Sequence, residues 1–218
     1  MKVRYSYLPQ QFENCEDLWQ DLKDFVATGD FTLGEPLKKF EKSFAQLIGT
    51  KYAVGVNSGT DAIKLSLKAL NIGPGDEVIT AANTFVATVG AICELGATPV
   101  FVDCNDTFCM NVSLVEEKIT KNTKAFVPVH YTGYMTDMRL LNQISKIYNI
   151  PVVEDACQSI LGAIDGKNAG TWGKTGAFSL HPLKNINVWS DGGVIVTDDD
   201  DMYKKLRLLR NHGFENRD

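Results

Sequence analysis

The sequence predicts an α/β fold, a mainly parallel sheet covered by helices on both faces. Short, predominantly apolar segments such as 52–56 and 193–198 recur along the chain, as strands buried on both faces require. Helix-like segments alternate with them, for example 58–72, where Ala62 and Leu65 recur at helical spacing. This alternation is typical of a parallel sheet with both faces covered. No internal repeat or low-complexity linker divides the chain, so we expect one domain.

The expected elements follow a regular order. Two helix-like stretches come first, at 16–27 and 36–48. Strands are then expected within 52–56, 73–81, 98–103, 124–130, 151–155, 176–180 and 193–198. Helices are expected at 58–72, 84–96, 112–120, 135–149 and 201–213. We expect Ser113 to cap the helix at 112–120, and the acidic run 198–201 to form a solvated turn and a helix cap.

Composition excludes several classes of protein. The 218 residues are 44% apolar and 22% charged, as in ordinary globular proteins, and a net charge of −5 argues against a general nucleic-acid binder. No apolar stretch is long enough to cross a membrane, and residues 1–10 lack a secretory signal core. Five cysteines without zinc spacing and three histidines predict reduced thiols, a cytoplasmic location and no metal centre.

A candidate anion site lies in the segment VNSGTDA, where an expected strand ends and an expected helix begins. Ser58, Gly59 and Thr60 stand at the helix start, where free backbone N–H groups and the helix dipole attract a phosphate. Gly59 would let the phosphate come close. An ordinary Ser/Thr helix cap is the alternative interpretation.

A carboxylate follows the strand in the segment VVEDACQS. Asp155 would be costly to bury at a strand end unless a cationic or hydrogen-bonding group meets it. A protonated pyridine nitrogen would be such a partner, as in enzymes that use pyridoxal 5′-phosphate (PLP). A helix cap is again the alternative. Gln158, three residues on, adds a hydrogen-bonding amide.

The segment FSLHPLKNINVWSDGG places Ser179 and Lys184 after another strand. A lysine in a strand-end crevice can form an imine with a cofactor aldehyde, because desolvation frees its amine as a nucleophile. Phe85 follows the strand within 73–81 and could stack on a flat ring, although a core position is the alternative. Together with the anion site, the carboxylate and the amide, these residues point to PLP.

Several motifs in shared order resemble the DegT/DnrJ/EryC1/StrS family of sugar aminotransferases, which have the PLP-dependent transferase fold type I. The resemblance runs from GDFTLGEPLKKFEKSFAQLIGTKYAVGVNSGTDAI through GPGDEVITAANTFVATVGAICELGATPVFVD and PVVEDACQSILGA to GAFSLHPLKNINVWSDGGVIVTDD and RLLRNHG. It covers almost the whole chain.

The resemblance implies a role for each candidate residue. Lys184 would be the Schiff-base lysine, Asp155 would pair with the pyridine nitrogen and Gln158 would contact the ring hydroxyl. The phosphate would be held by Gly59, Thr60 and Ser179, and the ring would stack on Phe85. His181, Trp189 and His130 are weaker candidates for contact with the sugar, with packing or a solvated turn as the alternative.

The resemblance also implies a reaction and partners. The enzyme would move an amino group from L-glutamate to a keto-sugar, usually nucleotide-linked, in amino-sugar biosynthesis, and would act as a homodimer with shared active sites. A non-catalytic PLP-binding or regulatory protein is one alternative. A PLP-dependent sugar dehydratase is another, although such relatives carry His at the position of Lys184.

The domain expectation follows from the family pattern. We expect residues 1–218 to form the PLP-binding large domain, with an N-terminal helical segment at 1–50, and to lack the family's C-terminal small domain.

Overall fold

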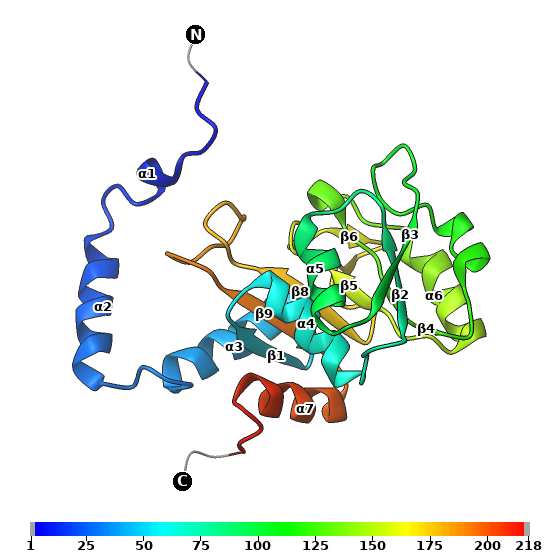
Figure 1. Ribbon diagram of the computed structural model, residues 1–218. Coiled ribbons are helices and arrows are strands. Elements are labelled where there is room, and N and C mark those ends of the chain that lie inside the picture. Colours follow the sequence, from blue (N-terminus) through cyan, green and yellow to red (C-terminus); the bar gives the residue numbers. More distant parts are fainter. Residues whose placement is uncertain (1–2, 216–218) are drawn as a thin grey trace.

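A twisted sheet runs through the centre of the structure, a computed structural model that describes residues 3–215 (Figure 1). Its strands are β1 Tyr52–Val56, β2 Glu77–Ala81, β3 Thr98–Val102, β4 Thr123–Val127, β5 Val153–Asp155, β8 Thr175–Ser179 and β9 Gly193–Thr197. They form two sheets, in the orders β1-β9-β8-β5 and β3-β2-β4. Parallel bridges from Phe126 to Val152 and from Val129 to Asp155 join β4 to β5, so the two sheets are continuous. The ladder is short here because Pro128 has no N–H to donate.

The sheet is mainly parallel, which confirms the predicted fold class. The pairs β2–β3, β2–β4 and β5–β8 are parallel, whereas β9 runs antiparallel to both β1 and β8. The carboxyl ends of β1, β2, β4, β5 and β8 therefore meet at one edge of the sheet. A small antiparallel pair, β6 Ala163–Ile164 with β7 Lys167–Asn168, lies outside the main sheet.

Helices cover both faces of the sheet and bury two apolar cores. On one face lie α4 Gly59–Ala69, α5 Val86–Glu94 and α7 Asp200–Arg210, whose Leu67, Ile92 and Leu206 are fully buried. On the other face lie α3 Glu35–Ile48 and α6 Met138–Tyr148, which bury Ile48 and Leu141. Each such side chain contributes about 1.5–3 kcal/mol by leaving water.

The acidic run after β9 caps a helix, as expected. Asp199 is the N-cap of α7, and its side chain accepts a hydrogen bond from the N–H of Met202 at 2.8 Å. Lys174 and this backbone bond lower the pKa of Asp199 below its ordinary value.

The helix predicted at 112–120 is wrong. The segment forms two 3₁₀ turns, Val112–Leu114 and Glu116–Lys118, and the cap is Asn111, whose side chain accepts from the N–H of Ser113. Only a few apolar side chains, such as Val112 and Val115, are buried here. Leu114 and Ile119 pack against the same core, so the two short turns already place the apolar side chains of the segment.

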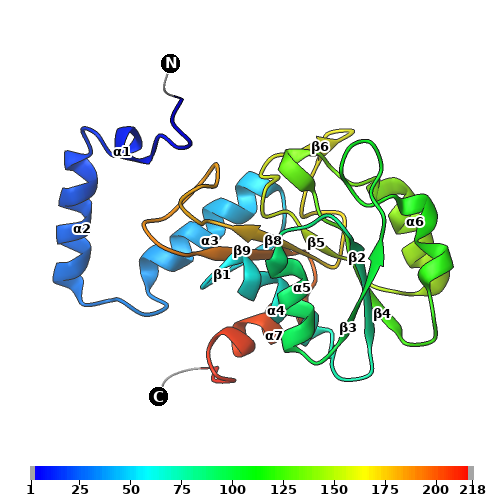
Figure 2. The same cartoon turned by 45° about the horizontal axis from the view of Figure 1, so that its top comes forward.

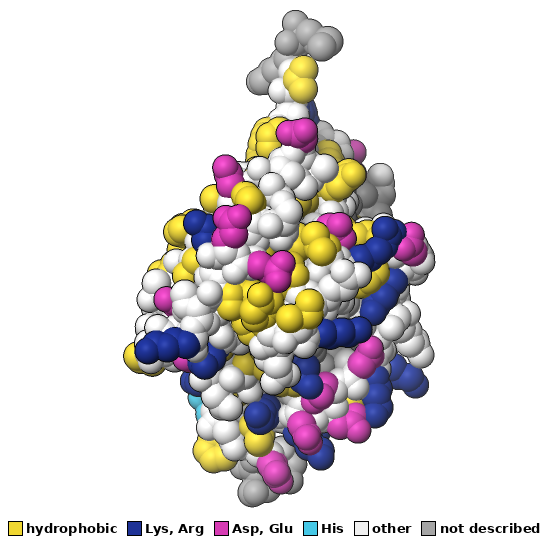
Figure 3. Space-filling view, turned by 90° about the vertical axis from the view of Figure 1, so that its right-hand side faces the viewer, with side chains coloured by type: hydrophobic (Ala, Val, Ile, Leu, Met, Phe, Trp, Pro, Cys, Tyr) yellow, Lys and Arg dark blue, Asp and Glu magenta, His cyan; other side chains and the backbone are white. Residues whose placement is uncertain are grey.

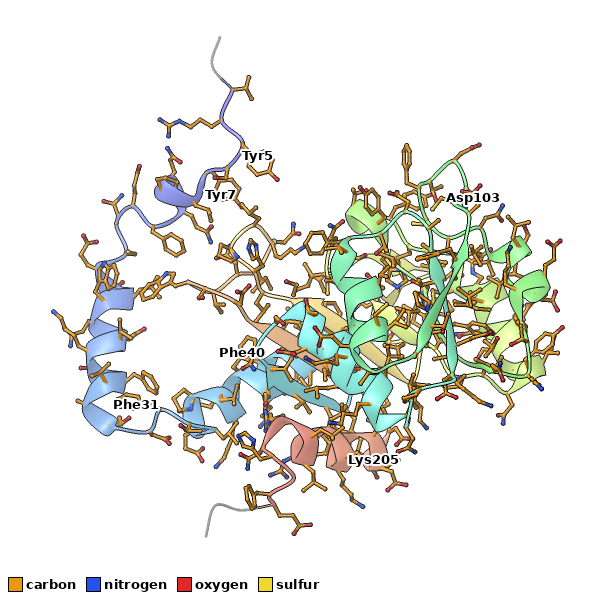
Figure 4. The ribbon with its side chains drawn as sticks, viewed as in Figure 1. Tyr5, Tyr7, Phe31, Phe40, Asp103 and Lys205 are labelled. Carbon is orange, nitrogen blue, oxygen red and sulfur yellow. The ribbon has the colours of Figure 1, made fainter. Side chains whose placement is uncertain are left out.

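The N-terminal segment is helical, and most of it stands apart from the sheet. It comprises α1 Leu8–Gln11, α2 Glu16–Thr28 and α3, and both views show α2 away from the body (Figures 1 and 2). No residue of α2 is buried, and Leu18, Leu22 and Val26 are exposed along it. At its end Phe31 packs edge-on against Phe25 (Figure 4).

No helix within residues 3–215 combines the length and apolar character that crossing a bilayer requires. Acidic and basic side chains are interspersed on the face shown in Figure 3. Among the same residues, no three His, Cys, Asp or Glu side chains come together in a way that could hold a metal ion.

Candidate active site

A cavity of about 430 Å³ opens at the edge where the carboxyl ends of the parallel strands meet. Loops after β1, β2, β4, β5 and β8 all contribute to its wall. The cavity brings together these predicted residues: Ser58, Gly59, Thr60, Phe85, His130, Asp155, Gln158, Ser179, His181 and Lys184. Tyr5, Tyr131, Cys157 and Asp191 line it as well. Tyr5 belongs to the segment that precedes α1, which lies on the same side of the molecule as the loop after β8 (Figure 4).

The turn from β1 into α4 forms one end of the cavity. Ser58 is the N-cap of α4, and its Oγ accepts from the N–H of Asp61 at 3.1 Å, so the helix-cap interpretation holds for its side chain. The N–H groups of Gly59 and Thr60 lie in the first helical turn, which has no intrahelical acceptors. A Cβ on Gly59 would lie 2.7 Å from Cys157 Sγ and 2.8 Å from Ser179 Cβ. Only glycine lets the turn pack this closely against the ends of β5 and β8.

Gly193 is the second residue of the glycine pair that ends the loop carrying Lys184, and its contacts show why a glycine is needed there. It begins β9 and faces the same turn: an added Cβ would lie 2.2 Å from the carbonyl oxygen of Ser58 and 2.9 Å from the N–H nitrogen of Gly59. The backbones of β9 and of the anion site are therefore in direct contact, and a side chain between them would push the helix start out of place.

Gly193→Ala should consequently be destabilising by roughly 1–3 kcal/mol, because the new methyl group overpacks a backbone contact. It should also weaken phosphate binding at the α4 N-terminus. Gly90→Ala is the matched control, since a Cβ there meets nothing within 4 Å and Gly90 lies inside α5. That change should be neutral or stabilising by up to about 1 kcal/mol. Urea unfolding of both variants measures the difference, and equal stabilities would contradict the contact.

Asp155 ends β5 as a nearly buried carboxylate, with 5% of its surface exposed. Its Oδ2 accepts from Thr88 Oγ1 at 2.7 Å and its Oδ1 accepts from the N–H of Cys157 at 3.2 Å. Neither donor carries a charge. The carboxylate is thus oriented but lacks a cationic partner among these contacts, which suits it to a cationic group in the cavity.

The Cys157 thiol is close enough to Asp155 and Lys184 for both to affect its pKa. Burial raises the pKa of this thiol well above its ordinary value, and the charge of Asp155 adds to the effect, whereas the charge of Lys184 opposes it. The thiol therefore stays protonated at neutral pH. Because the thiolate is the nucleophilic form of cysteine, this buried thiol is a poor nucleophile.

The loop after β8 holds the lysine in a fixed turn. The N–H of Lys184 donates to the carbonyl of His181 at 2.8 Å, and Asn187 Nδ2 donates to the carbonyl of Lys184 at 3.2 Å. His181 Nδ1 accepts from the N–H of Leu183 at 3.2 Å, which leaves its other ring nitrogen uninvolved in this turn. The His, Lys and Asn residues of the segment therefore build the turn that directs residue 184 to the cavity.

Gln158 is positioned by a strained neighbour. Its Oε1 accepts from the N–H of Thr132 at 2.9 Å, and Thr132 has a φ of 53°, in the left-handed region. Phe85, the N-cap residue of α5, lines the same cavity with 66% of its surface exposed. A ring that stacked on Phe85 would cover this exposed face.

Two of the weaker candidates have other roles in the structure. His130 lines the cavity, but its ring is fully buried: Nε2 lies 2.9 Å from Glu154 Oε2, and Nδ1 accepts from the N–H of Thr136. Neither ring nitrogen is free for a sugar. Trp189 does not line the cavity; its ring lies 4.9 Å from that of Trp19 and 6.1 Å from that of Phe12. The alternative interpretation, packing against other side chains, therefore describes both His130 and Trp189.

Sequence reasoning missed Glu154 and Thr88. Glu154 is fully buried, and besides His130 it accepts from the N–H groups of Gly170, Trp172 and Gly173 at 2.6–2.9 Å. Alternation along β5 places it on the opposite face from Asp155. That alternation was a usable signal for Glu154, but no local pattern indicated that Thr88 reaches Asp155.

The fold and the site together define the class. A doubly covered parallel sheet with a helix start after β1, a buried carboxylate at the end of β5 and a lysine after β8 matches the fold of PLP-dependent aminotransferases. The structure of S. venezuelae DesV in complex with a ketimine intermediate matches it with a TM-score of 0.95 and 38% identity, over 99% of this chain and 59% of that one. The structure of NtdA from Bacillus subtilis with bound cofactor PMP matches with a TM-score of 0.93 and 39% identity, over 98% and 49%.

Sequence comparisons give the family. The model of the DegT/DnrJ/EryC1/StrS aminotransferase family matches residues 13–218, and the chain belongs to this family. It is 40% identical to the pleiotropic regulatory protein of Geobacillus stearothermophilus, over 98% of this chain and 58% of that protein. It is also 40% identical to dTDP-3-amino-3,4,6-trideoxy-alpha-D-glucose transaminase of Micromonospora megalomicea subsp. nigra, over 97% and 57%. The chain thus spans less than two thirds of the length of these relatives.

Proposed function

We propose that this chain is the PLP-binding large domain of an aminotransferase that moves an amino group from L-glutamate to a keto-sugar in amino-sugar biosynthesis. One observation carries the proposal: the cavity brings Lys184 and Asp155 to the same wall as the anion site of Gly59 and Thr60. Membership of a family with sugar transaminases among the relatives supports it.

The residues present fit PLP at each of its functional groups. The α4 N-terminus, with Gly59 packed too closely for a Cβ, suits the phosphate, and Ser179 adds a hydroxyl at the same end. Asp155, met only by neutral donors, suits a protonated ring nitrogen. Gln158 can donate its amide N–H to the ring hydroxyl while its oxygen stays on Thr132, and Phe85 can cover one ring face.

In this proposal Lys184 is the residue that transfers protons during the reaction. When bound, PLP supplies an aldehyde that links to amines and a ring that withdraws electrons. Lys184 Nζ would be the amine that holds the cofactor at rest and, once free, would take a proton from the substrate carbon that bears nitrogen and give it back. Asp155 would pair with the protonated ring nitrogen. The turn held by His181 and Asn187 fixes the backbone of Lys184, which lines the cavity.

The donor, the sugar and the location of the protein are part of the same proposal. The amino donor is L-glutamate, the acceptor is a nucleotide-linked keto-sugar, and the protein works in the cytoplasm. A relative named as acting on a dTDP-sugar supports the nucleotide. His181 has a ring nitrogen outside its own turn and lines the cavity, so it is the better sugar contact of the three weak candidates.

We also propose a homodimer with shared active sites, in which α2 docks on the partner subunit. An apolar row at Leu18, Leu22 and Val26 is exposed along a helix with no buried residue, and such rows mark interfaces. Leu22→Asp should shift the protein toward monomer in size-exclusion chromatography with light scattering, while Lys23→Ala on the same helix should not. A monomeric unaltered protein would contradict the proposal.

The decisive experiment adds PLP to the purified protein and follows its absorption spectrum. The proposal expects the spectrum of lysine-linked PLP, its conversion by L-glutamate to that of pyridoxamine phosphate, and its return on addition of a keto-sugar. Aminated product, detected by mass spectrometry, then identifies the sugar. Bound PLP that glutamate leaves unchanged would contradict the aminotransferase function.

A non-catalytic regulatory protein is the second candidate, favoured by the relative named as a pleiotropic regulatory protein. It predicts bound PLP without conversion by glutamate in the same experiment. A sugar dehydratase is disfavoured because position 184 is Lys, whereas the family resemblance implies His at this position in the dehydratases.

A further inference from the structure

Thr88 forms the shortest contact of the candidate catalytic carboxylate. It lies in the first turn of α5 and is fully buried, and its Oγ1 is 2.7 Å from Asp155 Oδ2 across 67 residues of chain. One helical turn earlier, Thr84 Oγ1 is 2.7 Å from Thr88 Oγ1. The two hydroxyls and the carboxylate thus form a continuous row that leads into the cavity wall.

The direction of these hydrogen bonds follows from the number of hydrogens. An ionised carboxylate only accepts, so Thr88 donates its single hydroxyl hydrogen to Asp155. Thr88 must then accept from Thr84. The Thr84–Thr88 and Thr88–Asp155 contacts, both 2.7 Å, thus form one directed row that ends on the carboxylate.

The row also sets the plane of the carboxylate. Oδ2 is held by Thr88 from α5, and Oδ1 by the N–H of Cys157 in the turn after β5. Two donors from different elements hold the two oxygens, and each oxygen keeps a lone pair that neither donor uses. Thr88 is neither charged nor among the residues lining the cavity, so its effect on a ligand has to pass through Asp155.

We propose that Thr88, supported by Thr84, is a positioning residue that holds the Asp155 carboxylate oriented toward the ring nitrogen of PLP. The inference rests on the proposed function, because it assumes that the cavity takes PLP. Hydrogen bonds to charged groups are strong enough that losing this one should weaken PLP binding about tenfold to a hundredfold.

The test compares two cofactors on the apoprotein, PLP and its 1-deaza analogue, in which a C–H replaces the ring nitrogen. Thr88→Val keeps the shape of the side chain and removes the donor. It should weaken PLP binding about tenfold or more and change the affinity for the analogue by less than about twofold. Thr88→Ser keeps the hydroxyl and should restore most of the PLP affinity, and Thr84→Val should give a smaller loss confined to PLP.

The outcomes separate the positioning role from simple packing. Equal losses for both cofactors in Thr88→Val, or no loss for either, would overturn the inference and leave the proposed function intact. If Thr88→Val does not fold, as judged by thermal unfolding of the apoprotein, the same comparison on Thr84→Val decides the matter. An unaltered protein that binds neither cofactor would instead refute the proposed function, and this inference with it.

Discussion

Replacing Lys184 with alanine should abolish the covalent attachment of PLP and lower transamination by at least about 10²–10⁴-fold. Under the proposed function, the variant loses both the amine that would bond to the cofactor aldehyde and the group that would move the proton. Borohydride reduction of PLP-loaded protein, followed by peptide mass mapping, should place the label on residue 184 in the unaltered protein and nowhere in the variant.

Two further lysine variants sharpen this test. Lys184→Arg keeps a positive charge beside Cys157 but has no nucleophilic amine, so it should fail as Lys184→Ala does. Lys124→Ala removes an exposed lysine whose Nζ donates to the carbonyl of Lys121 at 3.3 Å, outside the cavity, and it should retain labelling and activity. A label that persisted on another lysine in Lys184→Ala would refute the assignment.

Glu154→Ala should destabilise the fold by about 3–5 kcal/mol, the largest effect on stability that we expect from a single side chain. The change removes a fully buried acceptor and leaves His130 and three backbone N–H groups of residues 170–173 without their partner. Such a loss is a large part of the roughly 5–15 kcal/mol that stabilises a typical domain.

Urea unfolding at one fixed protein concentration measures this loss. Glu116→Ala is the control, because Glu116 is exposed and its side chain meets only Tyr148 Oη, at 3.1 Å. It should change stability by no more than about 0.5 kcal/mol. If Glu154→Ala unfolded at the same urea concentration as Glu116→Ala, the result would show that the hydrogen bonds of Glu154 do not stabilise the loop of residues 170–173.

The order of strands and helices was readable from the sequence because each element has a strong local pattern. The apolar run at β4 and the helical spacing in α4 each predict their own element without reference to the rest of the chain. The prediction of a helix at 112–120 was wrong because local pattern alone did not decide the structure there. Its composition permits a helix, but two short 3₁₀ turns are enough to bring Val112 and Val115 into the core and Leu114 and Ile119 against it.

The same distinction between local patterns and long-range packing applies to the candidate site. By itself the sequence determined which chemical groups stand at the strand ends, Lys184, Asp155 and the anion turn at Gly59, because strand polarity places such residues at one edge of a parallel sheet. Only the tertiary structure decided their partners: Thr88 on Asp155, His130 on Glu154 rather than a sugar, and Trp189 on Trp19. These contacts join residues far apart in the chain, so they depend on how whole elements pack, and no local pattern encodes them.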